Sequence, residues 1–311
     1  SLLPATFFLC LFFLHPAVRL CGQSPADPFI VVLGIAQDAG YPHIGCTKEC
    51  CQRFYDGKEK KHFVSSLAIV DPASGQRFLF DCTPDFPAQV HLLDSLSPPG
   101  KTIDGIFLTH AHIGHYTGLM YLGRESMNAS SVKVYTMPEM HLFLQNNGPW
   151  SLLVQLQNIE LHKMKADSVI RLNESISVTP FLVPHRHEFT ETVGYKISIG
   201  KKSVIFIPDI DKWNKWDSDI LQLVKENDLL FIDGTFFRDG EIAGRNMSAI
   251  PHPFIEESMK LFDHLPAAEK AKIHFIHLNH TNPALIKGSD AQHEIEQKGF
   301  HVAKEGAVMV L

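Results

Sequence analysis

Thr109-His110-Ala111-His112-Ile113-Gly114-His115 is the most informative stretch of this 311-residue chain. Its three histidines directly follow an apolar run of β type, Gly105 to Leu108. Histidine is the commonest metal ligand in proteins, so a tight turn with three imidazoles can direct them at one or two cations. A fortuitous cluster of surface histidines is the alternative, and other ligand-type residues in comparable positions would count against it.

Such residues follow five further β-rich runs of the chain. An apolar strand holds its end rigidly, and loops at strand ends often carry binding and catalytic groups. Six polar clusters of this kind favour one site assembled from several strand ends. The polar groups are Asp81, the pair His185 and His187, the pair Asp209 and Asp211, Asp233, and the pair His277 and His280.

The arrangement of strand and helix patterns predicts the fold class. Residues 23–311 show no linker, charge block or internal repeat, so we expect a single domain. Helical patterns are fewer than β-rich runs and lie between groups of them, which predicts an α/β (α+β) fold with two sheets and helices on the outer faces. The expected strands are 29–34, 66–70, 77–80, 105–108, 132–136, 177–183, 192–199, 203–207, 229–232, 273–278 and 307–311.

Residues 1–22 are predicted to be a signal peptide. Leu2 to Leu14 is almost entirely apolar, but it is shorter than the roughly 20 residues that a membrane span needs. We therefore expect an exported protein, periplasmic or secreted, without a membrane span after removal of this segment. A buried N-terminal helix or an uncleaved anchor is the alternative. A lipid anchor through Cys21 is a weaker one, because Leu20 is larger than the residue that usually precedes such a cysteine.

The composition excludes some classes of partner. Hydrophobic residues make up 45% of the chain and charged residues 20%, which is enough apolar material for a core. The formal net charge is −6, so the chain lacks the excess of positive charge that general nucleic-acid binding requires. We expect a small-molecule or peptide substrate instead.

The histidine turn resembles the hallmark of the metallo-β-lactamase superfamily, a His-x-His-x-Asp-His turn after a strand. Within this superfamily the chain resembles the family of pyrroloquinoline quinone biosynthesis protein B, through Gly40-Tyr41-Pro42, Leu229 to Phe237 and Phe275 to Pro283. Its early cysteines are similar to those of the cyclic phosphodiesterases of phosphonate metabolism. The resemblance covers about Phe29 to Leu311 and implies an αββα sandwich with metals at one edge of the two sheets.

The resemblance also implies a set of metal ligands. The first ion would be held by His110, His112 and His185, and the second by His115 and His277. The carboxylate of Asp209 would bridge the two ions. Asp81 and Asp233 would support these ligands from behind. His187 competes with His185, and Asp211 with Asp209; each is otherwise a supporting or solvated residue.

Gly114 departs from the superfamily pattern, which has an aspartate ligand of the second ion at this position. Because glycine has no coordinating side chain, the second ion would keep only His115, Asp209 and His277. Sites with one ion and with two ions therefore both stay open.

The early cysteines indicate a separate structural zinc site. Cys46, Cys50 and Cys51 resemble the zinc loop of the phosphodiesterases, and His280 fits the late histidine that completes that site. Lys48 stands where a cysteine is usual, so Cys50 would have to take over by a shifted geometry. A Cys46–Cys51 disulfide or free thiols are the alternatives in an exported protein.

The leading functional hypothesis is a metal-dependent hydrolase that attacks an ester, lactone, amide or phosphodiester with metal-activated water. Asp209 or Asp211 would accept the proton. Zinc is the expected ion, with manganese or iron as alternatives. The resemblance implies a rival function, an iron-dependent hydroxylase acting on a peptide tyrosine, although a signal peptide counts against a cytosolic biosynthetic role. Because Gly114 removes a usual metal ligand, a third function also remains an alternative, that of a non-catalytic binding protein stabilised by metal.

Overall fold

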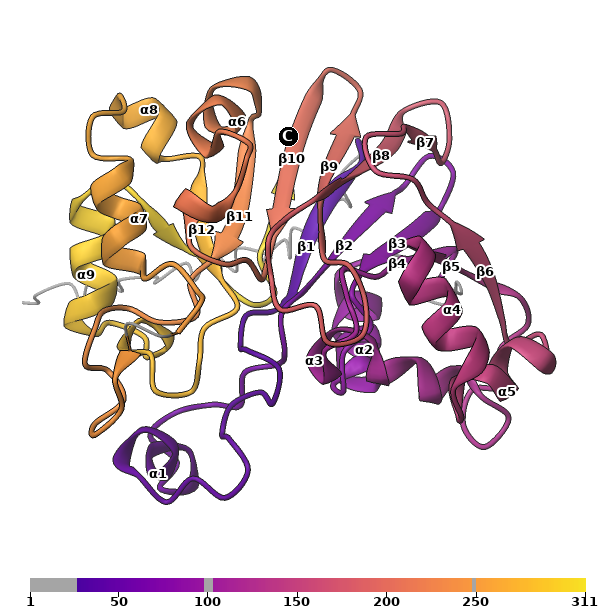
Figure 1. Cartoon of the computed structure of the whole chain (residues 1–311), viewed down its shortest axis with the longest axis horizontal. Coiled ribbons are helices and arrows are strands. Elements are labelled where there is room, and N and C mark those ends of the chain that lie inside the picture. Colours follow the sequence, from indigo (N-terminus) through magenta and orange to yellow (C-terminus); the bar gives the residue numbers. More distant parts are fainter. Residues whose placement is uncertain (1–26, 98–102, 248–249) are drawn as a thin grey trace, which may run out of the picture.

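Two sheets packed face to face form the centre of the molecule, with helices on their outer faces (Figure 1). The computed structural model describes residues 27–97, 103–247 and 250–311. The predicted αββα sandwich is confirmed. The proposed signal peptide lies outside the described residues. Among those described, no helix has the length and apolar character needed to cross a membrane.

The first sheet has seven strands, and its order brings both ends of the described chain together. The last strand pairs with the first strand, Phe29 opposite Val310. The strands in spatial order are β14 (Val308–Val310), β1 (Phe29–Gly34), β2 (Ser66–Asp71), β3 (Gln76–Phe80), β4 (Gly105–Phe107), β5 (Val132–Thr136) and β6 (Ile159–Lys163).

The second sheet also has seven strands and contains the later half of the chain. The strands in spatial order are β13 (His301–Val302), β12 (Ile273–Ile276), β11 (Leu229–Asp233), β10 (Lys202–Ile207), β9 (Val193–Ile199), β8 (Ile176–Leu182) and β7 (Ile170–Arg171).

The central strands are buried on both faces because each face meets a different apolar layer. In β1, Ile30 and Val32 belong to the large core between the sheets, whereas Val31 and Leu33 belong to the core beneath the outer helices. Alternate residues of a strand point to opposite faces, so an unbroken Val/Ile/Leu run suits a strand covered on both sides.

Helices cover the outer face of each sheet (Figure 1). Those beside the first sheet are α2 (Phe86–Leu96), α4 (Pro138–Asn146) and α5 (Trp150–Gln155). Those beside the second are α6 (Ile220–Glu226), α7 (Ile255–Leu261), α8 (Ala267–Lys270) and α9 (Asp290–Gln297). Helix α1 (Glu49–Tyr55) stands apart from both layers on a long loop.

Strand direction brings the polar strand ends to one edge. In the first sheet β1, β3 and β4 run in the same direction, because β1 and β3 are both antiparallel to β2 and β4 is parallel to β3. In the second sheet β8, β10, β11 and β12 share a direction for the same reason. The loops that follow these strands carry the predicted ligands.

Candidate metal centre

His110, His112, His185 and Asp209 form a first four-residue cluster, in which one ligand atom from each lies within 4.8 Å of the others. The Nε2 atoms of His110 and His185 lie 3.4 Å and 3.1 Å from Asp209 Oδ2. The Nδ1 atom of His112 lies 3.8 Å from the same oxygen. Three imidazoles and one carboxylate, contributed by both sheets, therefore converge on one point.

Two buried atoms of this cluster lack a hydrogen bond. His185 Nε2 lies 3.1 Å from Asp209 Oδ2 and Asp209 Oδ1 lies 3.2 Å from His252 Nδ1, but neither His185 Nε2 nor Asp209 Oδ1 makes a hydrogen bond with a described residue. A buried polar atom left unpaired is costly, and such atoms in native proteins usually have an unseen water or ion as partner. Three histidine nitrogens and a carboxylate are the donors that zinc, manganese and iron accept. The residues therefore fit a bound divalent cation.

The outer nitrogen of each imidazole in this first cluster has its own partner. His110 Nδ1 lies 3.0 Å from Thr109 Oγ1, and His185 Nδ1 lies 3.2 Å from Asp211 Oδ1. His112 Nε2 lies 3.1 Å from Glu188 Oε2. Partners of this kind orient metal-binding histidines and direct the inner nitrogen at the ion.

Electrostatics keep the first cluster in its ligating form. Burial lowers the pKa of His110 well below its usual value, and the neighbouring His115 lowers it further, so the imidazole stays neutral. Burial alone would raise the pKa of Asp209, but His185 and His252 hold it well below the usual range. A neutral imidazole and an ionised carboxylate are the states that bind metal.

A second cluster consists of Asp38, His115 and His277. Asp38 Oδ1 lies 3.1 Å from His115 Nε2 and 3.4 Å from His277 Nε2. Behind the two buried histidines, His115 Nδ1 donates to Asp81 at 2.6 Å, and Thr235 Oγ1 lies 3.0 Å from His277 Nδ1. The predicted supporting role of Asp81 matches this contact.

Asp38 corrects the ligand set expected for this second cluster. We expected His115 and His277 to share Asp209, but the carboxylate grouped with them is that of Asp38, whereas Asp209 lies with the first cluster. Asp38 lies four residues beyond Gly34, the end of β1, and no polar residue directly follows that strand. The available sequence signal for Asp38 was therefore only that it is a polar residue in the loop after an apolar strand.

His252 is another residue that the sequence did not reveal. It lies in the segment between β11 and α7, away from any strand end. Its Nδ1 lies 2.8 Å from Asp233 Oδ2 and 3.2 Å from Asp209 Oδ1. Asp233 also accepts hydrogen bonds from the backbone of Ile210 and Thr235, so it holds His252 beside the first cluster.

Two predicted residues lie elsewhere than expected. The imidazole of His187 is 59% exposed and pairs with Glu139, so it touches no ligand. Asp211 contacts the outer nitrogen of His185 and also pairs with Lys215 at 3.3 Å. Asp211 therefore orients a ligand and is not placed to accept a proton from water beside the inner nitrogens.

Cys46, Cys50, Cys51 and His280 form a separate cluster at helix α1. The sulfurs of Cys46 and Cys50 lie 3.7 Å apart, and no disulfide joins Cys46 to Cys51. Burial, aided by His43 and Lys48, lowers the pKa of His280 to about 4, so its imidazole is neutral. The four side chains suit a closed Cys₃His zinc site.

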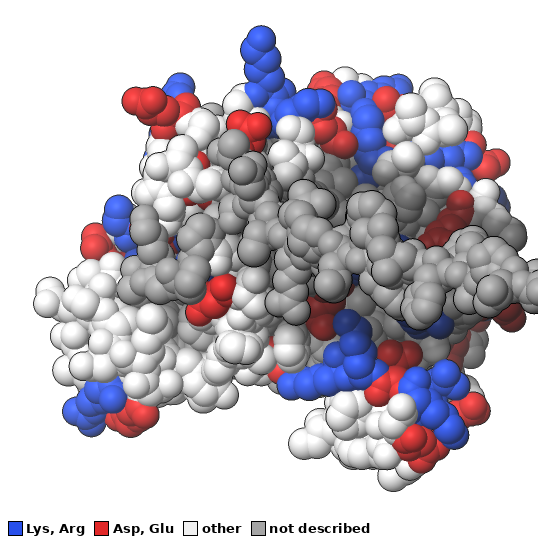
Figure 2. All heavy atoms as spheres, turned by 180° about the vertical axis from the view of Figure 1, so that it is seen from behind, with Lys and Arg blue, Asp and Glu red and all other residues white. Residues whose placement is uncertain are grey.

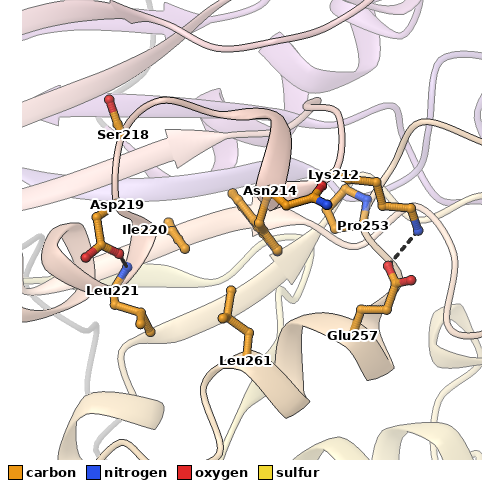
Figure 3. A pocket seen from close by; sticks show the side chains of 10 residues that line it. Lys212, Asn214, Ser218, Asp219, Ile220, Leu221, Pro253, Glu257 and Leu261 are labelled. Atoms are coloured by element: carbon orange, nitrogen blue, oxygen red, sulfur yellow. Dashed lines mark hydrogen bonds and ion pairs between the residues drawn. The ribbon is translucent and has the colours of Figure 1, made fainter.

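Two cavities border the loop that follows β10. One, of about 540 Å³, is lined by Trp213 and by the Lys212–Glu257 ion pair, 2.6 Å long, and contains none of the clustered histidines (Figure 3). The other, of about 510 Å³, is lined by His185 and Trp216. Only the second of these two reaches a ligand of the first cluster, so it is the better placed for a substrate.

Basic and acidic side chains are interspersed on the uncovered parts of the face shown in Figure 2. Neither sign forms a continuous patch there. This distribution agrees with the net charge of −6.

Comparison with protein families gives a match over residues 76–275, to a model described as the beta-lactamase superfamily domain. The chain is also similar to coenzyme PQQ synthesis protein B of Ruegeria pomeroyi, with 26% identity over 307 residues, 91% of this chain and 99% of that protein. The protein of the same name from Acinetobacter baylyi is 27% identical over 310 residues, 90% and 99% of the two chains.

Two solved structures are similar in fold. Zn(2+)-bound PqqB from Methylobacterium extorquens has a TM-score of 0.77 and 22% identity, over 91% of this chain and all of that one. A diphosphatase from the PhnP family has a TM-score of 0.62 and 22% identity, over 91% and 96% of the two chains. At this identity the likeness concerns the fold alone.

Proposed function

This chain belongs to the beta-lactamase superfamily, and from this premise we propose that it is a metal-dependent hydrolase. Its first cation would be held by His110, His112, His185 and Asp209. The observation that carries the proposal is the convergence of four metal-type donors, in which the buried atoms His185 Nε2 and Asp209 Oδ1 make no hydrogen bond with a described residue. Zinc is the proposed ion, with manganese and iron as alternatives.

A divalent cation in this cluster would supply a Lewis acid and lower the pKa of its bound water to about 7. The chain's own residues prepare the site for it. Thr109, Glu188 and Asp211 fix the three imidazole rings, and Asp209 stays ionised although it is buried. Ester, lactone, amide and phosphodiester bonds are the substrate groups that suit this chemistry.

A second candidate function is an iron-dependent hydroxylation of a peptide tyrosine. The similarity to coenzyme PQQ synthesis protein B, over about nine-tenths of the chain, supports it. So does the cluster of Asp38, His115 and His277, because two histidines and one carboxylate are the donors of many non-haem iron oxygenases.

The first test is the metal content of the full chain, measured by elemental analysis after exhaustive dialysis. We expect the wild type to retain metal and the His110→Ala/His112→Ala variant to lose one equivalent of it. A matched double variant, His91→Ala/His293→Ala, removes two exposed histidines and should keep the wild-type content. Equal metal content in the wild type and the His110→Ala/His112→Ala variant would contradict the first cluster.

Activity then separates the two functions. The metal-loaded protein is assayed with p-nitrophenyl esters, a lactone and bis(p-nitrophenyl) phosphate, and separately for oxygen consumption with ferrous iron and a tyrosine-containing peptide. Hydrolysis that disappears in the His110→Ala/His112→Ala variant supports the hydrolase. Oxygen consumption without hydrolysis supports the second function and overturns the first.

A further inference from the structure

Gly114 is the residue at which this chain departs from the histidine turn of its superfamily. The position lies in a short helix, α3 (Ile113–Tyr116), and its backbone is not in the left-handed region, so the backbone does not require glycine. A Cβ atom added there would lie 2.6 Å from Oδ1 of Asp38 and closer still to its Cα. The space for a side chain at position 114 is already filled by Asp38, through both its backbone Cα and its carboxylate.

The loop after β1 holds Asp38 in this space through contacts with the second sheet. The amide of Gln37 donates to the carbonyl of Leu278 at 2.8 Å, and the amide of Leu278 donates to Ile35 at 2.8 Å. Leu278 directly follows His277, so the segments that carry Asp38 and His277 are bonded to one another. Asp38 is therefore placed by the backbone.

The two histidines that face Asp38 are equally well fixed. Both imidazoles are fully buried, and their outer nitrogens contact Asp81 and Thr235. Their Nε2 atoms point at the same carboxylate oxygen, at 3.1 Å and 3.4 Å. Two nitrogens and one oxygen converging in this way provide three donors and leave further positions open, as in catalytic metal sites.

We propose that Asp38 replaces the aspartate missing at Gly114 and, with His115 and His277, completes a second site for a divalent transition-metal ion. In this proposal the loop after β1, and not the histidine turn, supplies the carboxylate, which lies beside the position that a side chain at residue 114 would occupy. The inference deepens the proposed metallo-hydrolase and rests on it for the use of the second ion. The competing explanation is a plain ion pair between Asp38 and the two histidines, without metal.

The test exchanges the carboxylate between the two loops. Wild type, Asp38→Asn, Asp38→Gly and the swap Asp38→Gly/Gly114→Asp are stripped of metal, reconstituted with zinc and compared by elemental analysis and calorimetric titration. Asp38→Asn and Asp38→Gly should each bind one equivalent fewer than the wild type, or bind it at least about 10- to 100-fold more weakly, as expected when a metal-site residue is lost. In the swap, the Cα of residue 38 would still lie 2.4 Å from the new Cβ at position 114, so the loop after β1 must shift to admit it; an equivalent regained by the swap would add support to the proposal.

Asp85→Asn is the matched control. Its carboxylate bonds Lys61 and the amide of Val64 in the segment before β2, and it belongs to none of the clusters. This variant should bind as many equivalents as the wild type. An unchanged metal count in Asp38→Asn would overturn the proposal in favour of the ion pair.

A further variant covers the case in which the Asp38 variants do not fold. His110→Ala/His112→Ala leaves Asp38, His115 and His277 intact, so it should still bind one active-site equivalent; binding none overturns the second site.

Metal counts also separate this inference from the proposed function. If the wild type binds two active-site ions but does not hydrolyse any substrate, the second site is supported and the hydrolase is contradicted. If the wild type hydrolyses a substrate but Asp38→Asn binds as many ions as the wild type, the hydrolase is supported and the second site is contradicted.

Discussion

Asp81 and His277 both have backbone conformations that side-chain-bearing residues rarely adopt. Their φ angles are +66° and +65°, in the left-handed region, and both are fully buried. Such conformations cost about 1–3 kcal/mol each and persist where the surroundings fix them, often at functional sites. Asp81 contacts His115, and His277 is itself a proposed ligand. Both strained residues therefore directly follow a strand and begin the loop that enters the metal site.

His252 is expected to exchange a proton with the leaving group, because Asp233 fixes its ring beside the first cluster. Replacement by glutamine should lower kcat by about 10²- to 10⁴-fold, the usual effect of losing a general acid or base. The metal content should not change. His187→Gln, at an exposed histidine, is the control for both measurements. Loss of metal from His252→Gln would instead show that this residue is a ligand.

His274 is expected to make stability depend on pH. Burial, together with His301 and Lys304, lowers its pKa from 6.5 to about 4, so the unfolded chain takes up the proton more readily. The free energy of unfolding should fall as the pH drops from 6.5 towards 4, by about 2 kcal/mol between pH 7 and 4.5 from this group. Denaturant titration of His274→Gln should show a correspondingly shallower fall. His264→Gln, at an exposed histidine, should keep the wild-type slope.

At the scale of elements, the apolar runs were sufficient to predict most strands. Strand β1 has the predicted bounds, and β5 does too. Strand β6 was missed because only Ile159 in it is buried, so an edge strand carries a weak pattern. Helix α1 was missed because its cysteines indicated a metal loop, and its seven residues are too few for a clear helical period.

The site was predictable where a ligand directly follows a strand. His110, His185, Asp209 and His277 lie within three residues of a strand end and could be chosen from the pattern and the superfamily resemblance. His252 could not, because contacts between remote loops place it, and the signal for Asp38 was weak, because this residue lies four positions beyond its strand. The backbone pairing of Gln37 with Leu278, 241 residues away, has no local signal.

Helix α1 is expected to depend on zinc bound by its cysteines. The helix stands apart from the sheets, and Cys46, Cys50 and Cys51 are close to His280 of the loop after β12. Cys51→Ser should remove one zinc equivalent and increase amide hydrogen exchange in residues 46–55, because the metal contributes folding energy to such sites. Cys82→Ser, at a buried cysteine outside the cluster, should leave the zinc content unchanged. Unaltered exchange in Cys51→Ser would speak against a structural metal.

At the scale of the whole molecule, ligands from both sheets meet at one edge. His110, His112, His115 and Asp38 follow strands of the first sheet, whereas His185, Asp209 and His277 follow strands of the second. Bound ions would join the two halves of the sandwich, so metal affinity and the stability of the whole fold are coupled.

Removal of metal should therefore destabilise the entire protein. At a free zinc concentration 100 times Kd, one bound ion contributes about 2.7 kcal/mol to the free energy of unfolding. Thermal unfolding of the wild type should shift to a lower Tm after chelation and recover when zinc is restored. His110→Ala/His112→Ala should respond less, having lost one of the ions. An equal response of both proteins would assign the stabilisation to the cysteine site.

The contact between Gly114 and Asp38 also constrains how this chain could have evolved. A lineage with aspartate in the turn can reach the present arrangement only through two substitutions. Acquiring Asp38 first brings two carboxylates into one space, and losing the turn aspartate first leaves the Nε2 atoms of His115 and His277 without a carboxylate. Either single-step ancestor is expected to be impaired. The two positions should therefore change together or not at all, as an epistatic pair separated by 76 positions in the sequence.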